Sequence, residues 1–279
     1  MIPIWQAIIL AVVQGLTEFL PISSTAHLIL FPWLFHWTDP GLAFDVALHL
    51  GTLAAVLIYF FKTWVDLVLI GLGGNPLFGG LASSDTQRST LSSQRKLFWY
   101  LVLATIPAAL AGWALRDYIA TSFRNPVIAG VALIVVAIPM AVGERLTRST
   151  KDLLSVGLKD SLIIGMAQAT ALIPGVSRSG ATITTALFLN LNRHAAARFS
   201  FLLSTPIIAG AAVKEFLDIW KKGIPSGMEL HFLAGVIVSG VVGYAAIAGF
   251  LRYLQFGTFK IFIYYRIVLG IIVLALALL

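Results

Sequence analysis

Two polar side chains, Gln14 and Glu18, stand inside an otherwise apolar segment near the start of the chain. Residues four apart share one helix face, so both would project toward the turn that follows. An ionisable residue in an apolar stretch is costly and indicates function. The turn supplies hydroxyl nucleophiles and an imidazole that titrates near neutral pH: Ser23, Ser24, Thr25 and His27. The alternatives are a helix-end Glu18 at a wet interface and a simple N-cap at the hydroxyl cluster.

A second polar interruption surrounds Arg178, directly after Pro174 and Gly175. The planar guanidinium of arginine suits phosphate oxygens, and an arginine at membrane depth needs an anion, either Glu18 or a ligand. Helices restarting after the two prolines would aim their positive N-terminal ends at one cavity, which would bind an anion. The hydroxyl neighbours predicted to contact it are Ser177, Ser179 and Thr182. A purely structural ion pair between Arg178 and Glu18 is the alternative.

Other ionisable residues carry weaker signals. His49 and Asp45, four apart, are either a second layer of the site or an ordinary interior pair, and Arg266 is expected to extend toward the membrane surface. The chain contains no GxxxxGK[ST], HExxH or GxSxG pattern, which leaves nucleotide use, zinc proteolysis and serine-hydrolase chemistry unsupported.

The composition is that of a membrane protein. Of the 279 residues, 59% are hydrophobic and 11% are charged, against about 25% charged in soluble domains. The net charge of +7 is scattered between apolar segments, so it indicates membrane topology and no nucleic-acid partner. The absence of cysteine excludes disulfides and thiolate metal sites. The apolar start lacks the basic region and cleavage site of a removable signal peptide.

The order of apolar stretches predicts an all-α polytopic protein, a single membrane domain over residues 1–279. Six stretches are long enough to span a bilayer: Leu42–Phe61, Leu97–Leu115, Pro126–Gly143, Phe199–Val213, His231–Leu251 and Ile261–Leu279. Two others, Ile4–Trp37 and Ser161–Leu191, are interrupted by PISSTAH and PGVSRSGAT. Irregular backbone at membrane depth must be covered by protein or line a wet cavity, so these predict re-entrant helix-loop-helix hairpins.

Basic connections set the expected orientation. Residues 73–96 and 144–160 carry most of the loop Lys and Arg residues and are separated by two spans, which places both in the cytoplasm. The ends of the first hairpin and both chain termini then lie outside, and the ends of the second hairpin lie inside. Lys214, Lys221 and Lys222 conflict with this orientation.

The halves 1–143 and 161–279 resemble each other. Gln14 corresponds to Gln168 at an offset of 154 residues, and Thr52 to Thr205 at 153. One hairpin and three spans per half would turn the second copy over relative to the first. We therefore predict six transmembrane helices plus two oppositely inserted hairpins in an inverted-topology repeat, with a site at the midplane.

These motifs resemble the undecaprenyl pyrophosphate phosphatases linked to bacitracin resistance. QGLTEFLPISSTAH is similar to the family's (E/Q)xxxE segment and its Ser-Ser-Thr-x-His turn, and PGVSRSGAT to its PGxSRSxxT segment. The resemblance implies the fold just described, a divalent cation, and a site open to the outer face of the bacterial inner membrane. Two departures are Gln14, where many members carry a second acid, and His49, where glutamine is usual. The resemblance carries function onto Gln14, Glu18, Ser23, Ser24, His27, Ser177, Arg178, Ser179 and Thr182.

The expected reaction is removal of the terminal phosphate from the lipid substrate undecaprenyl pyrophosphate. Arg178 and its hydroxyl neighbours would bind the pyrophosphate, and Glu18 with Gln14 would hold Mg²⁺ or Ca²⁺. Ser24 would attack the phosphorus with His27 as general base, and direct attack by water or by His27 stays open. A lipid or ion transporter, such as a flippase of a polyprenyl phosphate, and a noncatalytic lipid-binding scaffold are the rival functions. The oligomeric state, including a homodimer, stays open.

Overall fold

A computed structural model describes residues 2–81, 87–122, 124–222 and 227–279 of the chain. Within these ranges the protein is all-helical, and Lys151 and Leu191 form one isolated bridge in place of any strand. The helices are α1 (Ile4–Phe19), α2 (Ser24–Leu34), α3 (Leu42–Tyr59), α4 (Phe61–Gly71), α5 (Gln87–Ser122), α6 (Pro126–Leu146), α7 (Leu158–Thr170), α8 (Arg178–Phe188), α9 (Arg193–Lys222), α10 (Glu229–Tyr253) and α11 (Lys260–Leu278), with a 3-10 turn at Leu153–Ser155.

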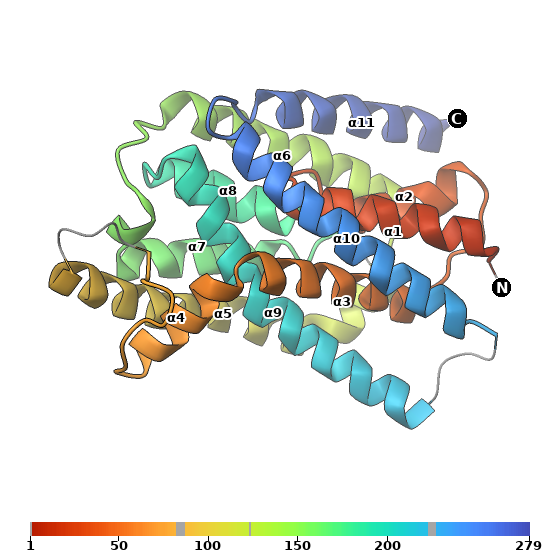
Figure 1. Ribbon diagram of the computed structural model, residues 1–279. Helices are drawn as coiled ribbons and strands as arrows, with labels where there is room; N and C mark the ends of the chain where they lie inside the picture. The colour runs from red at the N-terminus through yellow and green to blue at the C-terminus, as the bar shows by residue number, and fades with distance from the viewer. Residues whose placement is uncertain (1, 82–86, 123, 223–226) are drawn as a thin grey trace.

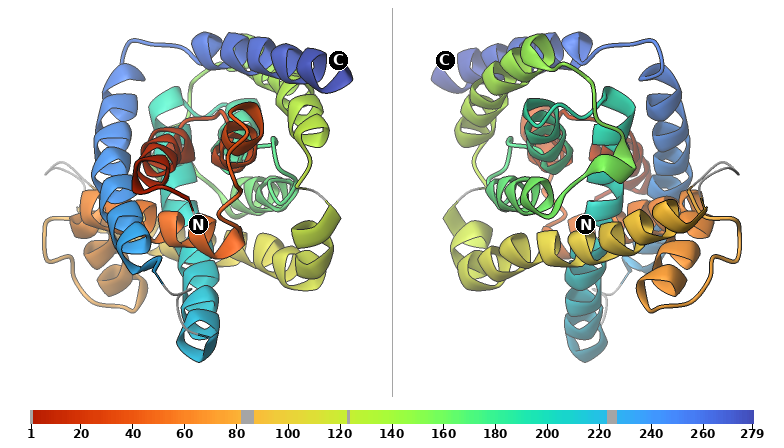
Figure 2. Two further views of the ribbon diagram at one scale, coloured as in Figure 1. Left: turned by 90° about the vertical axis from the view of Figure 1, so that its right-hand side faces the viewer. Right: turned by 90° about the vertical axis from the view of Figure 1, so that its left-hand side faces the viewer.

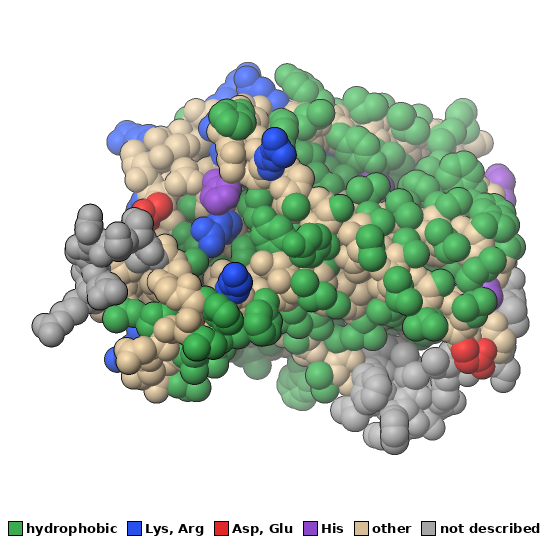
Figure 3. Space-filling view, viewed as in Figure 1, with side chains coloured by type: hydrophobic (Ala, Val, Ile, Leu, Met, Phe, Trp, Pro, Cys, Tyr) green, Lys and Arg blue, Asp and Glu red, His purple; other side chains and the backbone are tan. Residues whose placement is uncertain are grey.

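Six of the helices are long and apolar enough to cross a membrane, which confirms the six expected spans. In the described chain these are α3 and segments of α5, α6, α9, α10 and α11. Large apolar side chains remain exposed along them, as expected of surfaces that face lipid. Hydrophobic side chains cover the middle of the molecule in Figure 3, whereas Lys and Arg gather toward the end where α10 gives way to α11. The chain is a multi-pass membrane protein.

The two interrupted stretches form helix-loop-helix hairpins, α1 with α2 and α7 with α8. Each pair packs against itself, and the two hairpins enter from opposite ends of the molecule so that their loops meet near its centre (Figure 1). The second helices begin at Ser24 and Arg178 and end at Leu34 and Phe188, so their bounds are related by the offset of 154 seen in the sequence.

The capping residues of the second helices match as well. Ser23 and Ser177 have φ angles of 73° and 72°, and the Oγ of each accepts a hydrogen bond from the backbone N–H three residues later. A serine in this left-handed conformation is strained, and such strain persists only where the surroundings hold it. Both hairpin loops are therefore held in the same unusual conformation.

The hairpin helices lie inside a surround of longer helices. Viewed end-on in Figure 2, α5, α6, α10 and α11 lie around α1, α2, α7 and α8. The helices that pack most extensively are α10 against α1 and α3, α11 against α6, and α5 against α7. The loops between the hairpin helices are thereby covered by protein (Figure 2).

The two ends of the molecule differ in what they carry. Both chain termini lie at one end, and the connections from α4 to α5 and from α6 to α7 lie at the other (Figure 1). The two basic connections therefore lie at the same end in Figure 1, as the sequence predicts.

One helix is absent from the sequence prediction. The first span was expected to run from Leu42 to Phe61, but α3 ends at Tyr59 and the chain turns at Phe60 into the separate helix α4. The buried Asp66 on α4 accepts backbone hydrogen bonds from Leu77, Phe78 and Gly80 at 2.6–2.9 Å. These bonds tie the following connection to α4, so residues 77–80 are part of the folded end of the molecule.

Candidate active site

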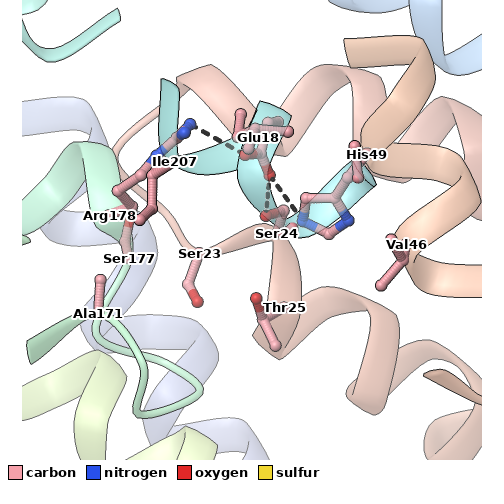
Figure 4. A pocket seen from close by; sticks show the side chains of 13 residues that line it. Glu18, Ser23, Ser24, Thr25, Val46, His49, Ala171, Ser177, Arg178 and Ile207 are labelled. Carbon is pink, nitrogen blue, oxygen red and sulfur yellow. Dashed lines mark hydrogen bonds and ion pairs between the residues drawn. The ribbon is translucent and has the colours of Figure 1, made fainter. Parts of the chain in front are cut away.

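The carboxylate of Glu18 is the centre of the site. It lies near the end of α1, is 7% exposed, and contacts side chains from three other elements (Figure 4). Its Oε1 accepts a bond from Arg178 Nη2 at 2.9 Å, and its Oε2 accepts one from the Ser24 hydroxyl. Gln14 Nε2 donates to Oε2 at 3.0 Å from one turn earlier in α1. The expected shared face of Gln14 and Glu18 is therefore present.

Arg178 is the first residue of α8 and reaches Glu18 from the opposite hairpin. The ion pair considered from the sequence therefore exists, but it uses only part of the guanidinium. Within the described chain, Arg178 Nε and Nη1 are buried and have no hydrogen-bond partner. A buried donor left unpaired costs about 1–3 kcal/mol. Two unpaired donors beside a cavity are suited to the oxygens of a phosphate group.

A cavity of about 230 Å³ opens between the two hairpins. The first hairpin contributes Glu18, Ser23, Ser24 and Thr25 to its wall, and the second contributes Ala171, Ser177 and Arg178. The remainder is mostly apolar side chains of α3 and α9. The N-termini of α2 and α8 lie at this cavity, so their positive dipole ends favour an anion there.

A family model described as "Bacitracin resistance protein BacA" matches residues 7–272, a range that includes both hairpins. The chain belongs to the BacA family. It is 47% identical to a protein of Thermomicrobium roseum named undecaprenyl-diphosphatase, over 97% of both chains. It is 45% identical to a protein of the same name from Pelotomaculum thermopropionicum, over 98% of this chain and 97% of that relative.

Five of the predicted site residues meet in this BacA-family chain. The five residues, which all line the cavity, are Glu18, Ser23, Ser24, Ser177 and Arg178. Gln14 is not among them, but its amide donates a hydrogen bond to Glu18. The oxygen Gln14 Oε1 has no partner among the described residues. Thr52 Oγ1, on α3, contacts Gln14 Nε2 at 3.5 Å and links this polar group to the first span.

Two predicted phosphate-binding residues have other contacts in the BacA-family site. Ser179 donates its hydroxyl to the backbone oxygen of Leu20 at 2.9 Å, which joins the two hairpins. Thr182 Oγ1 lies 2.7 Å from Ser200 Oγ on α9. In this arrangement both hydroxyls serve the packing around the cavity.

The ring nitrogens of His27 contact groups other than the Ser24 hydroxyl. Its Nδ1 lies 2.7 Å from the backbone oxygen of Ser23, and since a carbonyl only accepts, Nδ1 carries the proton. Its Nε2 lies 2.7 Å from the hydroxyl of Tyr265, and the two rings stack. Both ring nitrogens are thus occupied. The role of His27 as general base remains a prediction, and these contacts do not favour it.

His49, a weak candidate in the sequence, lies next to Glu18 in the structure. It lines the cavity from α3, and its Nε2 lies 3.4 Å from Glu18 Oε2 (Figure 4). Its Nδ1 is 2.7 Å from the Asp45 backbone oxygen, so that nitrogen donates. The spacing of Asp45 and His49 was the available signal, but the interaction is with the backbone of Asp45, whose carboxylate binds Arg124 at 2.7 Å.

The residues around Glu18 fit a divalent cation in part. In a neutral His49 ring, Nε2 is an acceptor that faces the acceptor Glu18 Oε2, and a cation or a proton between them would relieve this contact. The unpartnered Gln14 Oε1 is a further oxygen ligand within the described chain. The described residues contain no group of three His, Cys, Asp or Glu side chains suited to a metal. Phosphate oxygens would have to complete the coordination, as is common for Mg²⁺.

Proposed function

We propose that this chain hydrolyses undecaprenyl pyrophosphate to undecaprenyl phosphate and inorganic phosphate. Membership of the BacA family and the shared name of relatives at 45–47% identity support this activity. Such a reaction returns the lipid carrier to the synthesis of peptidoglycan and other cell-wall polymers. It also confers bacitracin resistance, in keeping with the description of the family.

The observation that carries the proposal is the meeting of Ser24 and Arg178 on one carboxylate. A hydroxyl nucleophile and a guanidinium lie on opposite hairpins, and Glu18 bonds to both beside a cavity. Two nitrogens of that guanidinium have no hydrogen-bond partner in the part of the chain that the structure describes. Phosphoryl transfer depends mainly on positioning and charge stabilisation. A transporter or a passive lipid scaffold would not need a hydroxyl oriented by a buried acid.

The chemical steps follow from these contacts. Arg178 and the N-terminal ends of α2 and α8 bind the terminal phosphate, while the apolar surroundings exclude water. Ser24 Oγ attacks the terminal phosphorus, its proton passes to Glu18, and the bond from that phosphorus to the bridging oxygen breaks. Undecaprenyl phosphate leaves with the bridging oxygen. Water then attacks the phosphoserine, releases inorganic phosphate and restores the Ser24 hydroxyl.

Glu18 takes the place of His27 as proton acceptor in this scheme, because Glu18 is the group that contacts the Ser24 hydroxyl. A carboxylate that receives this proton can return it to Ser24 when phosphate leaves. Ser23 and Ser177 cap α2 and α8 and set the direction in which Ser24 and Arg178 enter the cavity. Gln14 holds Glu18 in place by its amide.

We further propose a Mg²⁺ or Ca²⁺ requirement. Glu18 and Gln14 are the residues that would hold the ion, with His49 beside them. A bound divalent cation would neutralise charge that builds up on the phosphate oxygens.

The membrane arrangement that we propose has two re-entrant hairpins in an inverted-topology repeat, with halves at residues 1–143 and 161–279. It is supported by the common offset of α2 and α8, by their matching serine caps, and by the entry of the hairpins from opposite ends (Figure 1). We propose that the basic end faces the cytoplasm and that the site opens to the periplasmic side of the bacterial inner membrane.

The decisive experiment is phosphate release by the purified protein from undecaprenyl pyrophosphate in detergent, with and without EDTA. Hydrolysis in detergent needs no sealed bilayer, so turnover there supports an enzyme and excludes a function limited to transport. We expect EDTA to stop the reaction and Mg²⁺ or Ca²⁺ to restore it. The absence of phosphate release from folded protein with added cation would contradict the proposal.

A further inference from the structure

Among the described residues, Arg266 is the largest side chain that is completely buried, although the sequence suggested that it would extend outward. It lies within α11, whose other residues are apolar apart from Lys260 at its start and the tyrosines Tyr264 and Tyr265. Among the described residues no carboxylate forms an ion pair with it, which distinguishes it from Arg178, Arg124 and Arg193. A buried guanidinium without an acid is costly unless its N–H groups are fully used.

The N–H groups of Arg266 donate hydrogen bonds to backbone carbonyls of three separate segments. Nη1 donates to Pro21 O at 3.1 Å in the first hairpin loop, and Nη2 donates to Gly175 O at 2.7 Å in the second. Nε and Nη2 also donate to Leu133 O and Ala132 O of α6 at 3.1 and 3.2 Å. One side chain therefore joins both loops to the surrounding helices.

The loops that Arg266 joins also contact each other. Gly175 N donates to Ser23 Oγ at 3.1 Å, and Ser179 Oγ donates to Leu20 O at 2.9 Å. Gly175 has a φ of 96°, and a Cβ at this position would lie 2.5 Å from the backbone oxygen of Ala129. The two loops and Arg266 thus form a tightly packed junction. Within this junction the second loop has little room to move toward α6.

The residues of the junction are close in sequence to the proposed reacting groups. Pro21 lies three residues before Ser24, and Gly175 lies three residues before Arg178. A shift of either loop would therefore change how the Ser24 hydroxyl faces the Arg178 guanidinium. A misplacement of about 1 Å can reduce catalysis about 10²-fold.

We infer that Arg266 is a positioning residue that fixes the two hairpin loops relative to each other, so that Ser24 of one faces Arg178 of the other. Arginine is required because its planar fork offers five N–H donors in fixed directions. Lysine keeps the charge, but its single ammonium nitrogen cannot donate to all four carbonyls that the three guanidinium nitrogens reach. The link to turnover rests on the proposed function, whereas the link to loop geometry does not.

The test compares Arg266→Lys with the parent and with Arg252→Lys, which alters an exposed arginine in the last turn of α10. Thermal melting, kcat and KM for phosphate release are measured in one detergent. We expect Arg266→Lys to lower kcat at least about 10-fold at a temperature where it is folded, with KM changed less than about threefold. Arg252→Lys should match the parent.

A second readout follows the loops without any substrate. Because the chain has no cysteine, nitroxide labels can be placed through cysteines at Phe35 and Phe188, exposed positions near the ends of α2 and α8. We expect the distance distribution between the labels to broaden in Arg266→Lys and to stay narrow in Arg252→Lys. If Arg266→Lys does not fold, Gly175→Ala disturbs the same junction and should broaden the distribution too.

The outcomes separate the two proposals. An unchanged distance distribution together with a normal kcat in folded Arg266→Lys would overturn the positioning role. So would an activity loss that merely follows the unfolded fraction while the distribution stays narrow. If the parent protein releases no phosphate, the proposed function fails, and the label distances still decide whether Arg266 fixes the loops.

Discussion

At the residue scale, the site is a single buried carboxylate that binds a hydroxyl, a guanidinium and an amide. Glu18 bonds to Ser24, Arg178 and Gln14, and His49 lies beside it. The sequence allowed us to predict that one site contains Gln14, Glu18, Ser24 and Arg178, because each belongs to a short local motif. The partner of His49 could not, because that contact joins α3 to α1 and depends on how the two helices pack.

A substitution at Gln14 tests the proposed divalent-cation site. Gln14→Glu adds a carboxylate on the helix face that carries Glu18, so it should preserve activity and tighten divalent-cation binding. Cation titration of phosphate release and calorimetry on the substrate-free protein would measure the two effects. An inactive but folded variant would show that Gln14 acts as a neutral hydrogen-bond donor to Glu18.

Arg178→Lys tests whether Arg178 binds phosphate or only balances Glu18. Lysine keeps the charge but loses the planar fork, so we expect kcat to fall on the order of 10²-fold while thermal stability changes little. The kinetics and melting of Arg178→Lys and Arg178→Ala should be compared in one preparation. A lysine variant that melts early but turns over normally when folded would support the purely structural role.

At the element scale, the hairpins are positioned by close helix packing around them. The six spans could be predicted because their length and apolar character are local properties. The turn at Phe60 could not be predicted, since Phe60 lies between two other aromatic residues and no Pro or Gly marks the break between α3 and α4. The burial of Arg266 was missed because its acceptors lie in distant loops.

Gly51 offers a test of this packing. A Cβ there would lie 2.2 Å from Val236 O and 2.1 Å from Ser239 Oγ of α10, so α3 and α10 would have to separate. We expect Gly51→Ala to destabilise the fold by about 1–3 kcal/mol. Activity should fall as well, because α3 carries His49 and Thr52.

The matched control for Gly51 is Gly249→Ala on α10, where no atom lies within 4 Å of the added Cβ among the described residues. It should leave both melting temperature and turnover near those of the parent. Equal stability of the two variants would contradict the close α3 to α10 contact.

At the scale of the whole molecule, the proposed arrangement fixes which surfaces meet which compartment. Single cysteines at Thr38 and Thr150, exposed positions at opposite ends, have no background because the chain lacks cysteine. Thr38→Cys should react only with reagent outside the cell, and Thr150→Cys only with reagent that reaches the cytoplasm. Ser84 and Ser226, which the sequence assigns to opposite sides, lie outside the described residues.

The reverse labelling pattern would turn the molecule over in the membrane, and labelling of both cysteines from one side would contradict the oppositely inserted hairpins. The sequence predicted the common end of the two basic connections, because apolar spans between them can be counted. It could not predict how closely the two loops meet, since that depends on Arg266, Gly175 and Ser23 together.

The central claim is that Glu18 organises a phosphatase site, and the most direct test is phosphate release from undecaprenyl pyrophosphate by Glu18→Gln beside the parent. Glutamine keeps the size of the side chain but removes the charge that binds Arg178 and accepts the Ser24 proton. We predict a loss of turnover on the order of 10²-fold or more in protein that remains folded in detergent. Cation-dependent turnover at the parent's rate in folded Glu18→Gln would contradict the account.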